Sequence, residues 1–309
     1  MLLGNCDKIR SIMDHTPVTP TRPIAEAGRL MMAEELATIR FFWPALRLSA
    51  DVTAVHETRK AIRRTFTLFK LFTPYFAPGR LETHRVGLRK IMRRLAPCRD
   101  VAVLRQKLDA YNESADSPLV GLASYWERHQ ARVDDELRAF LDRKRAARII
   151  ERYSQLADTE GAGLPDATEK TVPLLVRHAL PGLILQRVGA VRAWGDILPT
   201  LTPAQFHQLR IQFKEIRYTL TFFEDILSAE AGEFIDLSRR IQEHLGHLND
   251  AGVALGLMNE MRHHRAEAAV YGEFQNEEVA RLIAGFYPLY AEFDRPDIHR
   301  NLAASIANL

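Results

Sequence analysis

Two segments of the chain carry a histidine followed by arginines and lysines at helical spacing. They are VHETRKAIRRTFTLFKLF (55–72) and FHQLRIQFKEIRYTLTFF (206–223), which align without a gap at an offset of 151 residues. Guanidinium and ammonium groups bind phosphate and carboxylate oxygens, and a histidine beside an anion is favoured in its charged form with two N–H donors. These residue types indicate recognition of an anion that presents many oxygen atoms.

The basic residues of each segment fall on one face of a helix with 100° per residue. The face of the first segment holds His56, Arg59, Lys60, Arg63, Thr67 and Lys70, with Arg64 just outside it. The face of the second holds His207, Arg210, Lys214, Arg217, Tyr218 and Thr221. A single stripe of this kind is usually only a solvated surface. Here carboxylates are scarce in the first copy, and the stripe occurs twice in register, which favours a binding role.

Basic residues are concentrated between positions 56 and 107. This stretch has 14 arginines and lysines against three acidic residues, a net charge of +11, whereas the whole chain carries only +3. The helix expected at RVGLRKIMRRL (85–95) contributes Arg85, Arg89 and Arg93. Neighbouring helices lie about 8–10 Å apart, so basic side chains from both could line one groove. A field of this sign concentrates polyanions, without specifying which one.

A second pair of motifs supports an internal duplication. LAPCRDVAV (95–103) and LGHLNDAGV (245–253) follow the two histidine segments at an offset of 150 residues. Two motifs in the same order at nearly one spacing predict two helical bundles of similar plan. We interpret Asp100, Asn249 and Asp250 as helix N-caps, because each follows a proline or glycine and precedes an apolar run.

The predicted fold class is all-α, with two four-helix-type bundles packed with pseudo-two-fold symmetry. An irregular lead-in over 1–22 precedes a first helical half (23–157), a linker (158–173) and a second helical half (174–309). Helices are expected near 24–43, 52–73, 81–96, 100–112 and 119–157, then near 174–196, 203–228, 235–246, 250–270 and 273–293. No segment has the alternating pattern of a strand.

Composition indicates a globular protein, with 47% hydrophobic and 26% charged residues. No apolar run is long enough for a membrane span, and the N-terminus lacks the pattern of a signal peptide. Two cysteines, Cys6 and Cys98, provide no disulfide framework, so we expect a cytoplasmic protein. The histidines at 244, 247, 263 and 264 lack a cysteine or carboxylate constellation, so we expect no metal site and no cofactor.

The repeated motifs resemble the CHAD family, histidine-containing α-helical domains often fused to triphosphate-tunnel enzymes. The resemblance extends from about Pro23 to the last helix and rests on four motifs, which include LRKIMRRLAPCRDVAVL and IQEHLGHLNDAGVAL. It implies two four-helix bundles and a basic groove or cavity that binds inorganic polyphosphate. It also implies association with polyphosphate granules and their proteins, rather than catalysis.

The resemblance assigns polyphosphate-binding roles to two histidines and to the basic residues in register with them. The assigned residues are His56, Arg59, Arg63, Arg64, Arg85, Arg89, Arg93, Arg99, His207, Arg210, Lys214 and Arg217, and the helical faces add Lys60 and Tyr218. The second copy departs from the pattern, because Glu215 stands where the first copy has Arg64. Between positions 207 and 250 acidic residues outnumber basic ones by eight to five. We therefore expect the second half to bind more weakly.

Two other functions remain open at this point. A phosphohydrolase acting on polyphosphate or triphosphate would use the histidines as metal ligands or acid–base groups, although few carboxylates accompany them. A helical nucleic-acid binder would use the same positive charge, although the stripes lack exposed aromatic residues for base stacking. The chain has no ExExK signature of the triphosphate-tunnel enzymes and no phosphate-cradling GxxxxGK[ST] loop. We therefore expect a non-catalytic protein. Because no apolar run could span a membrane, we also expect no membrane partner.

Overall fold

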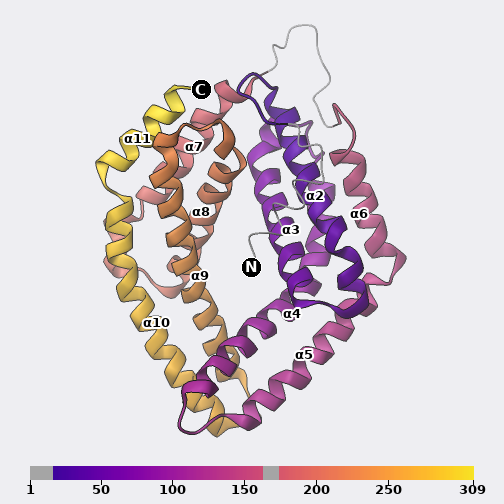
Figure 1. Ribbon diagram of the computed structural model, residues 1–309, viewed down its shortest axis with the longest axis vertical. Helices are drawn as coiled ribbons and strands as arrows, with labels where there is room; N and C mark the ends of the chain where they lie inside the picture. The colour runs from indigo at the N-terminus through magenta and orange to yellow at the C-terminus, as the bar shows by residue number, and fades with distance from the viewer. Residues whose placement is uncertain (1–16, 163–173) are drawn as a thin grey trace. The chain divides into compact units, whose positions relative to one another are not determined.

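The computed structural model describes residues 17–162 and 174–309. These residues form ten α-helices and four short 3₁₀ helices and contain no strand, apart from an isolated bridge between Pro23 and Leu175 (Figure 1). The all-α expectation is confirmed. The chain divides into two compact units, each described by itself. Unit 1 contains the chain up to Arg99 and Arg132–Leu180, and unit 2 contains Asp100–Ala131 and Pro181–Leu309.

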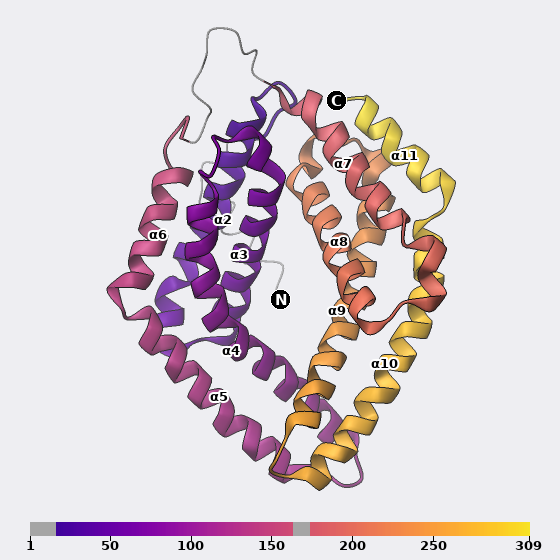
Figure 2. The same cartoon turned by 180° about the vertical axis from the view of Figure 1, so that it is seen from behind.

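Unit 1 is built around two long helices joined by a tight turn. Its helices are α2 (Ile24–Ser49), α3 (Val52–Phe72), α6 (Lys144–Ala157), the first part of α4 (Glu82–Ser114) and the last part of α5 (Val120–Leu141). Helix α2 packs against both α3 and α6 (Figure 2). A 3₁₀ turn (Thr73–Tyr75) follows α3 and leads into the loop before α4.

Two contacts show how closely the helices of unit 1 pack. A Cβ placed on Gly28 of α2 would come within 2.6 Å of the Phe72 ring of α3, so only glycine allows this approach. The Tyr153 hydroxyl of α6 donates to the Met32 carbonyl of α2 at 3.0 Å, and Tyr153 is fully buried. The first contact fixes the face of α3 that turns towards α2, and the second holds α6 against α2.

Unit 2 gathers its helices around an aromatic core. Its helices are the last part of α4, the first part of α5, the greater part of α7 (Val176–Arg192), α8 (Pro203–Phe222), α9 (Gly232–Glu260), α10 (Arg265–Phe293) and α11 (Pro296–Ala307), with 3₁₀ turns at Gly195–Thr200, Glu224–Ile226 and Ala229–Ala231. Helix α9 packs against both α8 and α10. The ring centroids of Phe213 and Phe234 each lie 5.1 Å from that of Phe293, so α8, α9 and α10 meet at one aromatic cluster.

Several predicted helix boundaries differ from the structure. The segments expected at 81–96 and 100–112 form the single helix α4, and α9 likewise runs through Gly246. The N-cap interpretation of Asp100, Asn249 and Asp250 is therefore wrong, because all three lie inside helices. Pro97 removes only one backbone donor from α4. The buried side of the helix continues from Leu95 before the proline to Cys98, Val101 and Leu104 after it.

The other differences concern helix ends and the grouping of the helices. The segment expected at 119–157 is divided into α5 and α6, and α11 was not expected. Residues 17–22 form no helix or strand, and residues 1–16 and 163–173, which make up most of the expected lead-in and linker, lie outside the described part of the chain. The compact units are not contiguous halves of the sequence, since α4 and α5 each contribute residues to both.

Candidate functional site

Each histidine helix begins with a capping residue placed five positions before the histidine. Asp51 caps α3 by accepting a hydrogen bond from the Ala54 N–H at 2.8 Å. Thr202 caps α8 within a capping box that includes Gln205. His56 and His207 therefore lie in equivalent early turns of their helices, and neither serves as the cap.

Unit 1 presents a basic surface along α3 and α4, which we call the α3–α4 basic face. It comprises His56, Arg59, Arg63 and Lys70 of α3 with Arg85, Arg89, Arg93 and Arg99 of α4. The α4 members lie within an arc of about 120°, opposite the buried residues of the same helix. Two observations show that the basic residues of the two helices are neighbours. Arg99 of α4 lowers the pKa of His56 of α3, and Lys70 of α3 lines one pocket with Arg85 and Arg89 of α4. The basic residues of α3 span 14 residues, or about 21 Å of helix.

Three arginines of this face keep their charge without a carboxylate partner. Arg63, Arg89 and Arg93 form no ion pair with any residue in 17–162 or 174–309, and the Nε of Arg63 is buried without a hydrogen-bond acceptor. Arg85 pairs with Glu82 at 2.6 Å on the surface. In unit 2, by contrast, Arg239 pairs with Glu224 and Arg240 pairs with Glu292, each at 2.8 Å.

Burial and neighbouring cations both disfavour the charged form of His56. Burial and the nearby Arg99 guanidinium lower the pKa of His56 from 6.5 to about 4, with smaller contributions in the same direction from Arg63 and Lys60. Glu57 acts in the opposite direction and is outweighed. His56 is therefore neutral at pH 7 in the protein alone, and it gains a proton more readily once an anion offsets the surrounding cations.

Two predicted site residues of α3 are engaged in ion pairs, and one of them, Arg64, turns towards α2 instead of this face. Arg64 donates from Nε to the Glu35 carboxylate at 2.5 Å, and Glu35 is only 6% exposed. Lys60 pairs with Glu57 at 2.6 Å. The cause is the position of α2, which covers the edge of α3 that carries Arg64, so this arginine serves to neutralise a buried carboxylate.

Unit 2 carries the second histidine on a smaller basic face of α8. His207 is exposed, and its Nδ1 lies 3.2 Å from the Asn249 Oδ1 of α9. Arg210 and Lys214 follow on the same side of the helix and are half-buried. His207, Arg210 and Asn249 line a pocket of about 290 Å³ whose other walls come mainly from aliphatic side chains of α9 and α10.

Two further predicted residues of α8 are engaged within unit 2. Tyr218 is 3% exposed and belongs to the core. Arg217 donates to the Gln242 side chain, and its guanidinium lies 5.5 Å from the Tyr218 ring centroid. Nearby cations of unit 2 are also neutralised, since Arg240 pairs with Glu292 at 2.8 Å. The basic face of α8 is therefore less positive than the α3–α4 basic face.

Sequence reasoning missed Asn249 as a site residue. Asn249 contacts His207, and at the offset of 150 residues it corresponds to Arg99, which acts on His56 in unit 1. The signal was present in the sequence, because the two motif pairs have nearly equal offsets. Arg99 and Asn249 occupy the same position in the two copies of the second motif. Each lies near the histidine of its own unit, Arg99 near His56 and Asn249 near His207. The expected groove shared by both histidine helices stays a prediction.

Neither a metal cluster nor a membrane-spanning helix is found in the described part of the chain. No group of three or more histidine, cysteine, aspartate or glutamate residues within 17–162 and 174–309 could hold a metal ion. No helix over the same residues is both long and apolar enough to cross a bilayer.

The fold and the two histidine helices define an all-helical protein with basic faces, and comparison with known proteins identifies its family. The chain belongs to the CHAD domain family, whose model matches residues 30–259. The solved structure of the CHAD domain from the plant Ricinus communis is similar at a TM-score of 0.70 and 20% identity, covering 96% of each chain. PptA from Streptomyces chartreusis is similar at a TM-score of 0.66 and 14% identity, covering 88% of this chain and 100% of the other. No curated protein matches the sequence.

Proposed function

We propose that this protein binds inorganic polyphosphate without catalysis, chiefly through the α3–α4 basic face and more weakly through the α8 face of unit 2. The observation that carries the proposal is the set of cations along α3 and α4: Arg63, Arg89 and Arg93 form no ion pair with any residue that the structure describes, and Lys70, Arg85 and Arg89 line one pocket between the two helices. A surface with this excess of positive charge attracts a polyanion.

Inorganic polyphosphate fits this surface in both charge and length. Each phosphate has oxygens that accept the forked donors of arginine, and each charge-assisted hydrogen bond contributes about 1.5–3 kcal/mol. A basic row of about 21 Å on α3 can engage several successive phosphates, whereas a single phosphate reaches only one or two of its cations. Membership of the CHAD family supports the same choice of ligand, and it supports a cytoplasmic location at polyphosphate granules.

The proposal is tested by reversing charges on each face separately. Arg63→Glu with Arg89→Glu alters unit 1, and Arg210→Glu with Lys214→Glu alters unit 2. We expect the first pair to weaken binding of long-chain polyphosphate at least 100-fold and the second pair to weaken it less. The matched control is Arg143→Glu with Lys144→Glu, which makes the same charge change at exposed positions at the start of α6, outside α3, α4 and α8.

Binding is measured by calorimetry at several salt concentrations. About six phosphate contacts predict that the logarithm of the affinity falls with the logarithm of salt with a slope of about −4. Equal losses in the control and in the unit 1 variant would show that only net charge matters and would reject the site. Release of orthophosphate would instead indicate a phosphohydrolase, and displacement by single-stranded DNA at equal phosphate concentration would indicate a nucleic-acid binder.

A further inference from the structure

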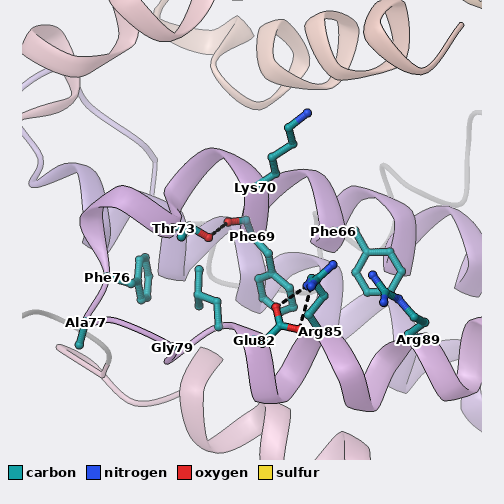
Figure 3. Close-up of a pocket in the computed structure, with 11 residues that line it drawn as sticks. Phe66, Phe69, Lys70, Thr73, Phe76, Ala77, Gly79, Glu82, Arg85 and Arg89 are labelled. Atoms are coloured by element: carbon teal, nitrogen blue, oxygen red, sulfur yellow. Dashed lines mark hydrogen bonds and ion pairs between the residues drawn. The ribbon is translucent and has the colours of Figure 1, made fainter. Parts of the chain in front are cut away.

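A pocket with aromatic walls lies at one end of the α3–α4 basic face. It has a volume of about 490 Å³ and lies between the end of α3, the loop that follows it and the start of α4 (Figure 3). Phe66, Phe69 and Phe76 form its apolar wall, and Arg85 and Arg89 form its basic side. Pockets for small organic ligands have volumes of this order and are mostly apolar with a few polar groups.

The aromatic wall belongs to the core of unit 1 and is already in place without a ligand. Phe69 is 1% exposed, and Phe76 and Leu81 are each 4% exposed, so these side chains are held by packing. Phe66 is only half-buried and offers its ring to the pocket. An inorganic phosphate chain has no apolar surface to bury against these rings. The pocket therefore suits a ligand that joins a planar apolar group to phosphate.

The basic side of the pocket retains donors for such a phosphate. Glu82 accepts from the Nε and one Nη of Arg85, at 2.6 and 2.7 Å, which leaves other N–H groups of the guanidinium available. Arg89 forms no ion pair with any residue that the structure describes. Lys70 contributes its alkyl stem to the pocket, and in Figure 3 its ammonium group extends away from the two arginines.

We propose that this pocket binds a nucleoside di- or triphosphate, with the base against Phe66 and the phosphates at Arg85 and Arg89. Stacking of a base on an aromatic ring tolerates any base, because every base has a π-face. The hydroxyl of Thr73, the one hydroxyl among the lining residues, donates to the Phe69 carbonyl at 2.5 Å. The site is accordingly expected to distinguish poorly between adenine and guanine. This proposal does not depend on polyphosphate binding.

The pocket is tested by calorimetric titration of the full chain with ADP, pyrophosphate and adenosine. We expect ADP to bind at least about tenfold more tightly than pyrophosphate, because stacking of the base adds to the phosphate contacts. Adenosine is expected to bind more weakly than ADP, because it lacks the phosphates. Equal affinities for ADP and pyrophosphate would overturn the proposal, since the aromatic wall would then contribute nothing.

A substitution that fills the pocket separates this site from the proposed polyphosphate site. Ala77 lines the pocket at the end away from Phe66 and Arg89 (Figure 3). Ala77→Trp should reduce ADP affinity at least tenfold while polyphosphate affinity changes less than threefold. The matched control is Ala139→Trp on an exposed position of α5, which should leave both affinities unchanged. Retained ADP binding by a folded Ala77→Trp protein would place the nucleotide elsewhere and reject the pocket.

A second variant keeps the test decisive if Ala77→Trp does not fold. Arg89→Ala removes a donor on an exposed turn of α4, where truncation leaves no buried partner. We expect about a tenfold loss of ADP affinity and no change in the affinity for adenosine, because adenosine has no phosphate to contact Arg89. An unchanged ADP affinity in this variant would overturn the assignment of the phosphates to Arg89.

Discussion

Adjacent arginines of α3 are predicted to have opposite roles, and replacing each with methionine tests this directly. Arg64 neutralises Glu35, which is 6% exposed, whereas Arg63 has no carboxylate partner among the described residues. Removing one member of a buried ion pair costs about 3–5 kcal/mol, because the remaining charge is left without compensation. Arg64→Met should therefore lower the free energy of unfolding by about 3 kcal/mol or more.

Arg63→Met should leave the free energy of unfolding within about 1 kcal/mol of the parent value, since it breaks no ion pair. It should instead weaken polyphosphate binding by about tenfold or more, the equivalent of one charge-assisted hydrogen bond. Denaturation in urea measures the free energy of unfolding, and calorimetry measures the affinity.

The double replacement Glu35→Leu with Arg64→Met provides the control for this prediction. A well-packed apolar pair often replaces a buried ion pair without loss of stability. The double variant should therefore regain most of the stability that Arg64→Met loses, and it should still bind polyphosphate. An Arg64→Met protein as stable as the parent, or one that folds but no longer binds, would refute the assignment of Arg64 to packing.

Three further predictions concern unit 1. Gly28→Ala should lower stability by about 1–3 kcal/mol in thermal melts, because its methyl group would meet the Phe72 ring, and an unchanged melting temperature would contradict the packing. Tyr153→Phe should cost about 1 kcal/mol in urea unfolding through loss of the hydrogen bond to Met32, and no loss would show that the bond contributes nothing. Stability should fall by up to about 1 kcal/mol, after solvent screening, as pH falls from 6.5 towards 4, because the unfolded state binds a proton that folded His56 does not. His56→Gln should remove this part of the pH dependence, and an unaltered profile would contradict the depressed pKa.

Periodicity predicted the helical class and the basic faces because both depend only on local spacing. It failed at Pro97, where burial of Leu95, Cys98 and Val101 on one side keeps α4 continuous through a residue that usually ends a helix. Helix ends of this kind are decided by tertiary packing, which a single-sequence pattern does not contain.

The candidate site was predictable in outline but not residue by residue. A helical projection places Arg63 within the basic face and Arg64 just outside it, but it does not show that Arg64 meets Glu35 of α2. Tyr218 likewise falls on the polar side of the projection and is buried. The neighbour that covers each edge is set by the packing of helices distant in sequence. By contrast, the nearly equal offsets of the two motif pairs, 151 and 150 residues, were visible in the sequence and relate Asn249, which contacts His207, to Arg99.

The most direct test of the account is an NMR titration of His56 in the full chain, with and without long-chain polyphosphate. The spectrum is assigned with the His56→Gln variant, and the pKa is read from the ring chemical shifts. We predict a pKa of about 4 in the protein alone and a value at least about 1 higher on the pH scale with polyphosphate, because bound phosphates offset Arg99. An identical His56 pKa in the presence of bound polyphosphate would show that the polyphosphate lies elsewhere, and it would contradict binding at the α3–α4 basic face.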